Sequence, residues 1–356
     1  MSQHPSSSGV LVFVGSYTEP LGHAPHAHGA GVTVLQVDVD SGAAQTLFEY
    51  GEIANPGYLC VDADRHIVYV VSELGTEGTL SALRFDEGFR TFIDRSVVDT
   101  GGTVASYVSL VGTDFALVSN YGDGSLASFA LRPDGGIDSR VSLVELSGSG
   151  PNLERQEGPH AHWLGLHPSN GWLYAADMGS DTLLQLSLHH GSGQLAIESV
   201  TPTTPGSGPR HIAFNSTGDR AYVVYELSSG IGVFDVRPDG VLVGRQELST
   251  LPADNTVESS AADLAVTADG GTVFASNRGH NSVVRFRADA SGDVHVVDWT
   301  ATADIPRSIT VTPDGRHLLV ANQDADLVQI YQCADDGQLT PTFSFPIATP
   351  VCIKCR

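Results

Sequence analysis

Apolar stretches of this chain recur in pairs, and a polar turn that contains Asp or Gly separates the two members of each pair. Runs such as AYVVY (221–225) are apolar on both faces, and no window has the i, i+3, i+4 spacing of an amphipathic helix. The pattern therefore predicts β-strands that are covered on both sides. Six complete pairs lie at residues 58–74, 107–121, 162–178, 211–227, 263–278 and 308–323.

A seventh pair is split between the two ends of the chain. Residues 9–17 (GVLVFVGSY) match only its second half, and residues 349–355 (TPVCIKC) match the missing first strand. After each pair comes another apolar strand and a second turn, in several copies of the Asp-Gly or Pro-Asp-Gly type. In such turns Gly adopts positive φ and Pro fixes the first corner. Each repeat is therefore expected to be a four-stranded antiparallel meander.

The length of the repeat distinguishes a β-propeller from a β-solenoid. The polar residue that ends each second strand recurs after 45 to 57 residues, close to the length of a propeller blade. We predict an all-β fold, a seven-bladed β-propeller with four antiparallel strands per blade, in which the N- and C-terminal strands share one blade and close the ring. The alternative, a β-solenoid, needs shorter repeats. Residues 1–356 are expected to form a single domain, with residues 1–8 disordered. A closed ring leaves few strand edges to cover, so a monomer is expected.

Composition narrows the classes of partner. The formal net charge is -23 and Lys354 is the only lysine, so binding to nucleic acid or to an anionic membrane is not expected. The sequence lacks the basic and apolar segments of a signal peptide and any apolar stretch of roughly 18 residues, so a cytoplasmic location is expected. The terminal CIKC (352–355) has Cys-x-x-Cys spacing, but a zinc site needs about four ligands and a redox pair normally begins a helix. We interpret these cysteines as structural thiols.

Antiparallel strands place the start of the innermost strand and the end of the second strand at one edge of every blade. Charged side chains at those positions are therefore expected to converge on one mouth of the central channel. At the starts of innermost strands these residues are His160, His162, Arg210, His211 and Arg307, and at the ends of second strands they are Asp177, Glu226, Asn277 and Arg278.

These residue types suit an anionic small-molecule substrate. Guanidinium groups bind carboxylate or phosphate through paired hydrogen bonds, and a glutamate and a histidine can act as acid and base. We predict His162, Glu226 and Arg210 as catalytic residues, with either His162 or Glu226 as the base. The alternative for each residue is an ion pair that closes the channel. The residues predicted to bind substrate are Arg278, Arg307, His160, His211 and Asn277.

The segment GHAPHAHGAG (22–31) inserts three histidines, His23, His26 and His28, on the same face. Three histidines this close together could bind a metal ion through their imidazole groups. The segment contains Pro and Gly and no nearby carboxylate, so a flexible lid is the preferred interpretation. No metal and no cofactor are expected.

Several phrases give the chain a family resemblance: VGSYT (14–18), NPGYL (55–59), SNYGDGS (119–125), RQEGPHAH (155–162), GSGPRH (206–211), YEL (225–227), SNRG (276–279) and PRSITVTPDGRHLLVANQ (306–323). The sequence resembles the lactonase family of seven-bladed propellers, which includes bacterial 6-phosphogluconolactonases and fungal 3-carboxy-cis,cis-muconate lactonizing enzymes. By this resemblance His162, Arg210, Glu226 and Arg278 are similar to the conserved cluster of the muconate-lactonizing branch, with Arg307 as the alternative for the fourth position. The family implies no obligatory metal.

The resemblance implies a lactonase that hydrolyses a sugar lactone, with 6-phosphogluconolactone as the preferred substrate. The alternatives are a cycloisomerase that forms a lactone from 3-carboxy-cis,cis-muconate, and a non-catalytic propeller that serves as an interaction platform. The two enzyme hypotheses use the same residues, so the sequence does not separate them.

Overall fold

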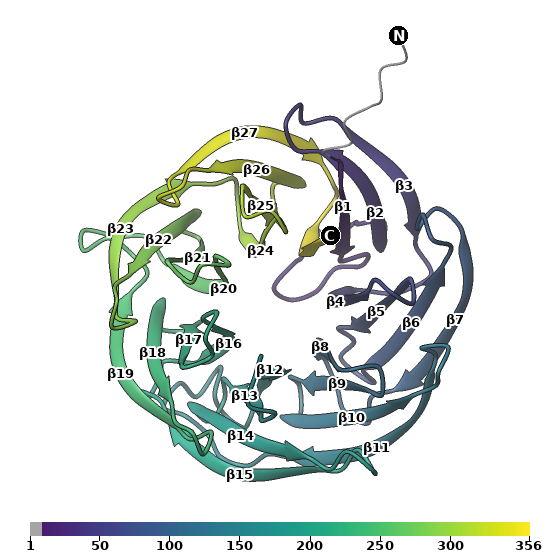
Figure 1. The fold of residues 1–356 in the computed structure, drawn as a ribbon, viewed down its shortest axis with the longest axis horizontal. Helices are drawn as coiled ribbons and strands as arrows, with labels where there is room; N and C mark the ends of the chain where they lie inside the picture. Colours follow the sequence, from purple (N-terminus) through teal and green to yellow (C-terminus); the bar gives the residue numbers. More distant parts are fainter. Residues whose placement is uncertain (1–8) are drawn as a thin grey trace.

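The computed structural model describes residues 9–356, which form 28 β-strands and no helix. The strands make seven four-stranded sheets that are arranged as blades around a central axis (Figure 1). The predicted fold class, a seven-bladed β-propeller, is confirmed. The expected disorder of residues 1–8 lies outside the described residues. No helix in the described part of the chain could cross a membrane, and the expected location and monomeric state stay predictions.

Each blade runs outward from its innermost strand. The first three are β28 (Pro350–Cys355), β1 (Gly9–Ser16), β2 (Val32–Asp38), β3 (Ala44–Tyr50); β4 (Pro56–Asp62), β5 (Ile67–Ser72), β6 (Thr79–Phe85), β7 (Phe92–Asp99); and β8 (Ala105–Val111), β9 (Phe115–Asn120), β10 (Ser125–Leu131), β11 (Ile137–Glu145). The next two are β12 (Ala161–Leu166), β13 (Leu173–Asp177), β14 (Thr182–Leu188), β15 (Leu195–Pro202); and β16 (Pro209–Phe214), β17 (Arg220–Tyr225), β18 (Gly230–Val236), β19 (Leu242–Ser249). The last two are β20 (Ser260–Val266), β21 (Thr272–Arg278), β22 (Ser282–Ala288), β23 (Val294–Ala301); and β24 (Pro306–Val311), β25 (His317–Asn322), β26 (Leu327–Cys333), β27 (Leu339–Pro346).

The two ends of the chain close the ring in one blade, as predicted. Strand β28 pairs antiparallel with β1, from Val12 opposite Cys355 to Gly15 opposite Cys352. Beyond the last paired residues, the backbone N–H of Leu11 donates to the carbonyl of Arg356 at 3.0 Å, and the reverse bond is 2.8 Å. The closure is therefore a hydrogen-bonded ladder between the first and last strands described, with one shift of register between Gly15 and Ser16.

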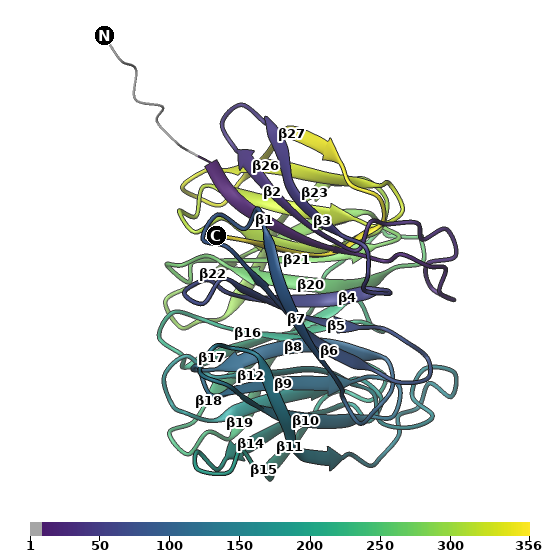
Figure 2. The same ribbon diagram turned by 90° about the vertical axis from the view of Figure 1, so that its right-hand side faces the viewer.

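The registers confirm the strand-edge argument. Ala161 at the start of β12 lies opposite Asp177 at the end of β13, and the same relation holds for β20 and β21. The side view shows the loop between β1 and β2 on one side of the disc, and the start of β1 and the C-terminus on the other (Figure 2). Innermost strands thus all begin at the face that carries the β1–β2 loop, which we call the entry face.

The cores lie between neighbouring blades. Side chains of the second strands are mostly buried, as in β9 and β17, whereas those of the outermost strands alternate between more and less exposed positions, as in β19 with the sequence LVGRQELS. This is the pattern expected when sheets pack face to face and only the rim meets water. The turn glycines predicted between third and fourth strands include Gly135 and Gly240, at φ 81° and 86°.

The Cys-x-x-Cys pair does not form one site. Positions i and i+3 of a strand point to opposite faces, and Cys352 and Cys355 of β28 pack into different hydrophobic clusters. All four cysteines are free, and burial raises the pKa of the Cys352 thiol to about 11. This placement supports the interpretation of structural thiols.

Candidate active site

A cavity of about 620 Å³ opens at the entry face. Its roof is formed in part by Leu21, Gly22 and His23 of the β1–β2 loop, which reaches toward the centre of the ring (Figure 1). Below this roof the wall comes from several blades, because each contributes the start of its innermost strand and the end of its second strand. The remaining lining residues are Glu73, Gly75, Val104, Ser106, Tyr121, Gly122, Arg155, His162, Glu226, Ser260, Arg278 and Arg307.

Glu226 is the centre of the first cluster. It directly follows β17, and only 5% of its surface is exposed. Its Oε2 atom lies 2.9 Å from Nε of Arg210 in β16 and 3.1 Å from Nη2 of Arg278 at the end of β21. Its Oε1 atom lies 2.6 Å from Nη2 of Arg155, in the loop between β11 and β12. Three guanidinium groups from three separate segments therefore converge on one carboxylate.

The charges of this cluster stabilise one another. Burial raises the pKa of Glu226, but the guanidinium groups of Arg278, Arg210 and Arg155 outweigh burial and hold it well below the usual range. Burial lowers the pKa of Arg278 to about 10, with the Glu226 carboxylate opposing that shift. At neutral pH the Glu226 carboxylate is therefore ionised, and Arg278 keeps its charge.

His162, the second residue of β12, places its ring in the cavity wall. Its buried Nδ1 atom has no hydrogen-bond partner within residues 9–356. Burial, followed by the positive charge of Arg210, lowers the pKa of His162 well below 6.5. A neutral imidazole with an unused ring nitrogen thus lies next to the arginine cluster.

A second cluster in the same cavity joins Tyr17, His23, Glu73 and Arg307. Nη2 of Arg307 donates to the Tyr17 hydroxyl at 2.7 Å and lies 3.6 Å from Oε1 of Glu73. Nε2 of His23 is 3.2 Å from the Tyr17 hydroxyl and 3.7 Å from Oε2 of Glu73. Burial, with Arg307 nearby, lowers the pKa of His23, although 47% of its side chain is exposed. The cavity therefore contains two carboxylates, each held by arginine.

The family model described as a lactonase with a 7-bladed β-propeller matches residues 11–355 of this chain. The chain belongs to this lactonase family. A curated 6-phosphogluconolactonase of Bacillus subtilis (strain 168) is 31% identical over 352 residues, which cover 96% of this chain and 97% of that protein. A 6-phosphogluconolactonase of Formosa agariphila is 29% identical over 334 residues, with 90% and 92% covered. The solved structure of the Pseudomonas aeruginosa periplasmic gluconolactonase PpgL has a TM-score of 0.89, 28% identity and coverage of 98% and 99%.

Two histidines predicted to bind substrate lie behind the cavity wall of this lactonase-family propeller. Nδ1 of His160 is 2.8 Å from the carbonyl of Tyr121, and its ring stacks on Tyr121 at 4.5 Å. Nδ1 of His211 lies 2.8 Å from Oδ1 of Asp263, and the His211 ring is in the layer beneath the cavity. His160 thus supports Tyr121, and His211 supports the floor below Arg210.

Asn277 and Asp177 require a correction, because the structure does not bring their side chains to the cavity. The Asn277 amide oxygen accepts from the Thr250 hydroxyl at 2.6 Å, and its nitrogen donates to the Thr250 carbonyl at 2.9 Å. Asp177 accepts from the backbone N–H groups of His160 at 2.6 Å and of Gly179 at 3.0 Å. The reason is positional: Asn277 and Asp177 lie within their strands, whereas Glu226 lies one residue beyond the end of β17.

Sequence reasoning did not predict Tyr17 and Glu73 as members of the second cluster. Glu73 directly follows β5, as Glu226 follows β17, so these two glutamates share one repeat position. A search for acidic residues at that position would have found Glu73. Tyr17 follows β1 in the same way, but a buried tyrosine at the end of a strand has no distinctive pattern in the sequence.

The histidine segment does not gather its three imidazoles. His23 lines the cavity, Nε2 of His28 is 3.4 Å from Oδ2 of Asp326, and His26 is exposed. Within residues 9–356, no group of three His, Cys, Asp or Glu side chains is placed to hold a metal ion. The loop itself is anchored by Ala24 and Ala27, which pack with Tyr17. Its role as a flexible lid stays a prediction.

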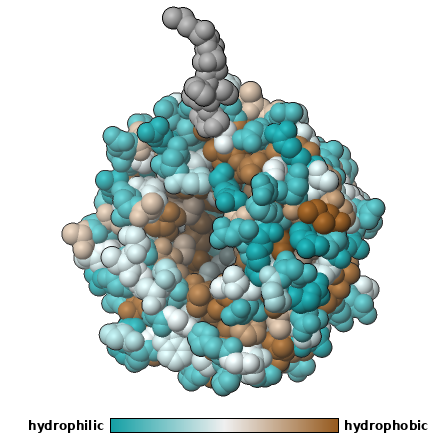
Figure 3. Space-filling model, turned by 45° about the vertical axis from the view of Figure 1, so that its right-hand side comes forward, coloured by the Kyte–Doolittle hydropathy of each residue, from teal (hydrophilic) through white to brown (hydrophobic). Residues whose placement is uncertain are grey.

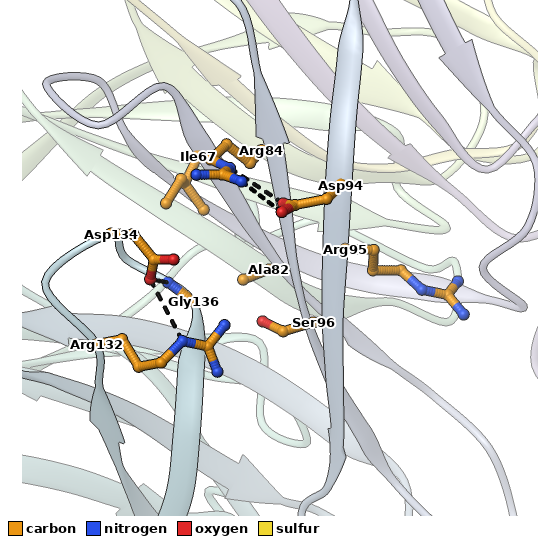
Figure 4. Close-up of a pocket in the computed structure, with 9 residues that line it drawn as sticks. All are labelled: Ile67, Ala82, Arg84, Asp94, Arg95, Ser96, Arg132, Asp134 and Gly136. Atoms are coloured by element: carbon orange, nitrogen blue, oxygen red, sulfur yellow. Dashed lines mark hydrogen bonds and ion pairs between the residues drawn. The ribbon is translucent and has the colours of Figure 1, made fainter.

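A recess between the outer parts of two blades differs sharply from the cavity. It has a volume of about 30 Å³ and is bordered by the ion pairs Arg84–Asp94 and Arg132–Asp134 (Figure 4). Arg95 points away from the other residues in this view (Figure 4). A space of this size holds about one water molecule, so these arginines serve as surface ion pairs.

Proposed function

We propose that this protein is a lactonase whose substrate is 6-phosphogluconolactone. One observation carries the proposal: guanidinium groups converge on one buried carboxylate beside a neutral imidazole, at the entry face of a chain whose net charge is -23. The names of the Bacillus subtilis and Formosa agariphila relatives support the same substrate.

The cavity suits an anionic ligand. Arg155, Arg278 and Arg307 line it, whereas only Glu73 and Glu226 contribute negative charge to its wall. Arg155 is the most exposed candidate for a phosphate contact, because 43% of its side chain is exposed while the carboxylate it holds is buried. A bidentate guanidinium contact with phosphate would fix the substrate in one orientation.

The reaction is the addition of water to the lactone carbonyl. The oxygen of water forms a bond with C1 as its proton passes to His162, and Arg278 stabilises the negative charge that develops on the carbonyl oxygen. The bond between C1 and the ring oxygen then breaks, and the ring oxygen takes the proton from His162. The new carboxylic acid group releases its proton to water to give 6-phosphogluconate, and the imidazole is again neutral.

His162 is a better base than Glu226 in this arrangement. The Glu226 carboxylate forms ion pairs with three guanidinium groups, so a proton on it would weaken those contacts. Burial, followed by the charge of Arg210, lowers the pKa of His162. A bound phosphate dianion adds negative charge nearby and raises that pKa toward the range in which an imidazole is an effective base. Glu226 then serves to hold the arginines in place.

The test is turnover of freshly prepared 6-phosphogluconolactone by the purified protein, coupled to 6-phosphogluconate dehydrogenase and measured above the uncatalysed rate. The wild type and Arg132→Gln, a surface variant outside the cavity, are expected to be active. His162→Gln is expected to lose about 10²–10⁴-fold in kcat, the usual contribution of a general base. Unphosphorylated gluconolactone, 3-carboxy-cis,cis-muconate and a chelator complete the series.

The outcomes separate the hypotheses. Turnover of 3-carboxy-cis,cis-muconate alone would overturn hydrolysis in favour of cycloisomerisation. No turnover of any of these compounds by the folded protein would favour an interaction platform. Activity that survives His162→Gln but is lost in Glu226→Gln would transfer the role of base to the glutamate.

A further inference from the structure

A second cavity opens at the opposite mouth of the channel, on the face where the innermost strands end. It has a volume of about 350 Å³, and aromatic side chains form much of its wall, namely Tyr58, Tyr107, Trp163 and Phe214. The space-filling view, which looks obliquely onto this face, shows a hollow with brown and tan apolar walls (Figure 3). We call this space the exit-face cavity.

A layer of side chains separates the exit-face cavity from the catalytic one. Arg210, His211 and Asp263 belong to this layer, which leaves a gap of only about 10 Å³. A gap of that size admits one water molecule at most. A ligand in one cavity therefore does not extend into the other, and the two spaces are separate sites.

The chain's only lysine lines the exit-face cavity. Lys354 lies near the end of β28, and its Nζ atom donates to the Tyr58 hydroxyl at 2.7 Å and lies 4.4 Å from the centre of the Tyr58 ring. No carboxylate within residues 9–356 forms an ion pair with it. Burial lowers the pKa of Lys354, but nearby Cys352 and Asp263 raise it more, so the ammonium stays charged.

The one carboxylate in this cavity wall is already saturated. Oδ1 of Asp263 accepts from Nδ1 of His211 at 2.8 Å and from the backbone N–H of Leu264 at 3.0 Å. Oδ2 accepts from the Ser308 hydroxyl at 3.0 Å and from the backbone N–H of Ile309 at 3.1 Å. Four donors therefore spread its charge into the protein, and two N–H bonds of the ammonium remain for a ligand.

We propose that the exit-face cavity is a second binding site, which takes a small aromatic monocarboxylate. The carboxylate accepts hydrogen bonds from Lys354, and the ring packs among Tyr58, Tyr107 and Trp163. A charge-assisted hydrogen bond supplies orientation, and the aromatic walls supply contact area. The volume lies within the range of small-molecule sites, about 300–1,000 Å³. One ammonium matches one negative charge, whereas the several arginines of the catalytic cavity match a phosphate dianion.

The site can be observed without a mutation. Protein labelled only with ¹⁵N-lysine has a single backbone amide signal, from Lys354, because the chain has one lysine. Titration with 4-fluorobenzoate is expected to shift this signal saturably, with matching broadening of the ligand's ¹⁹F resonance. The neutral analogue 4-fluorobenzyl alcohol is expected to bind about tenfold or more weakly, because it lacks the charge that pairs with the ammonium.

Variants of Lys354 test whether its positive charge binds the ligand. Lys354→Met is expected to weaken 4-fluorobenzoate binding about tenfold or more, whereas Lys354→Arg retains binding. Arg278→Gln, in the catalytic cavity, is expected to leave this binding unchanged. The proposal is overturned if the lysine signal does not shift in the wild type, if folded Lys354→Met binds as well as the wild type, or if Arg278→Gln abolishes binding. The lysine signal decides the question even where a variant fails to fold.

Discussion

Nη2 of Arg155 lies 2.6 Å from Oε1 of Glu226, although 71 positions of sequence separate the two residues. The pair joins an exposed guanidinium to a buried carboxylate, since the side chains are 43% and 6% exposed. The same guanidinium lies 3.4 Å from the Tyr121 hydroxyl. Arg155 is thus the member of the cluster that can turn toward a ligand, while Arg210 and Arg278 stay with the carboxylate.

Arg155→Gln is expected to impair phosphate binding more than chemistry. A charged hydrogen bond contributes about 1.5–3 kcal/mol, so KM for 6-phosphogluconolactone should rise about tenfold or more with a smaller change in kcat. Steady-state kinetics with phosphorylated and unphosphorylated lactone measure the difference. Arg132→Gln is the matched surface control. An equal effect on both lactones would contradict a role in phosphate recognition.

Glu226→Gln removes the only negative charge held by three guanidinium groups. Breaking a buried ion pair typically costs about 3–5 kcal/mol, so the free energy of unfolding should fall by roughly that amount. Inorganic phosphate should restore part of the loss, because an anion replaces the missing carboxylate. Urea unfolding in phosphate and in chloride buffers of equal ionic strength measures this. If phosphate raises the free energy of unfolding of the variant no more than that of the wild type, the result argues against an anion site.

Gly57→Ala tests Glu73 without changing any charge. A Cβ atom at Gly57 would lie 2.3 Å from Oε1 of Glu73, so the glutamate must move. Small displacements in an active site can cost up to about 10²-fold, and we expect kcat/KM to fall about tenfold with little change in the melting temperature. Gly51→Ala is the control, since its Cβ atom would meet the Ala30 carbonyl at an ordinary 3.5 Å. Unchanged kinetics in Gly57→Ala would remove Glu73 from the functional cluster.

Asn277→Ala should affect stability and leave catalysis intact. The substitution leaves the Thr250 groups without partners, and an unsatisfied buried polar group costs about 1–3 kcal/mol. We expect the free energy of unfolding to decrease by about 1–3 kcal/mol. We expect kcat/KM to change less than twofold, which corresponds to roughly 0.4 kcal/mol of activation free energy. Parallel unfolding and kinetic assays check both parts. A rise in KM at unchanged stability would return Asn277 to the substrate-binding set.

Acid should destabilise the protein through His211. Burial and the neighbouring Arg210 lower the pKa of His211 to about 4, although Asp263 opposes the shift. Between pH 6.5 and about 4 the unfolded chain therefore binds more protons than the folded one, so stability is fully present above pH 6.5 and falls as the pH falls. The loss is about 3 kcal/mol.

Urea unfolding between about pH 7.5 and 4.5 measures this slope. His211→Asn, which keeps a donor near Asp263 and removes the titrating ring, should flatten the profile. A remaining slope is expected from His162, whose pKa is also lowered. An unchanged profile in His211→Asn would place the acid sensitivity elsewhere.

The fold could be predicted almost entirely from the sequence, because the repeat is local. Paired apolar runs and Asp-Gly turns define strands one blade at a time, and the split between residues 9–17 and 349–355 defines the closure. The edge at which His162, Arg210, Glu226, Arg278 and Arg307 meet follows from antiparallel pairing alone. These features depend on the order and direction of the strands, and both remain the same when a predicted strand boundary is wrong by one or two residues.

The separation of cavity residues from supporting residues could not be predicted. Glu226 lies just after the end of its strand, whereas Asn277 lies just before the end of the corresponding strand in another blade. This difference of one residue determines whether the side chain faces the cavity or the interior of the blade. The contact between Arg155 and Glu226 depends on an irregular loop, for which the pattern of apolar residues holds no information. Side-chain packing, and not topology, determines these details.

The shared blade also affects the order of synthesis. During translation β1 can pair with β2 at once, but its other edge has no partner until Pro350–Cys355 is made. An unpaired strand edge is a template for pairing with other chains. Until this strand of six residues is made, the inner edge of β1 is therefore open to pairing with other chains.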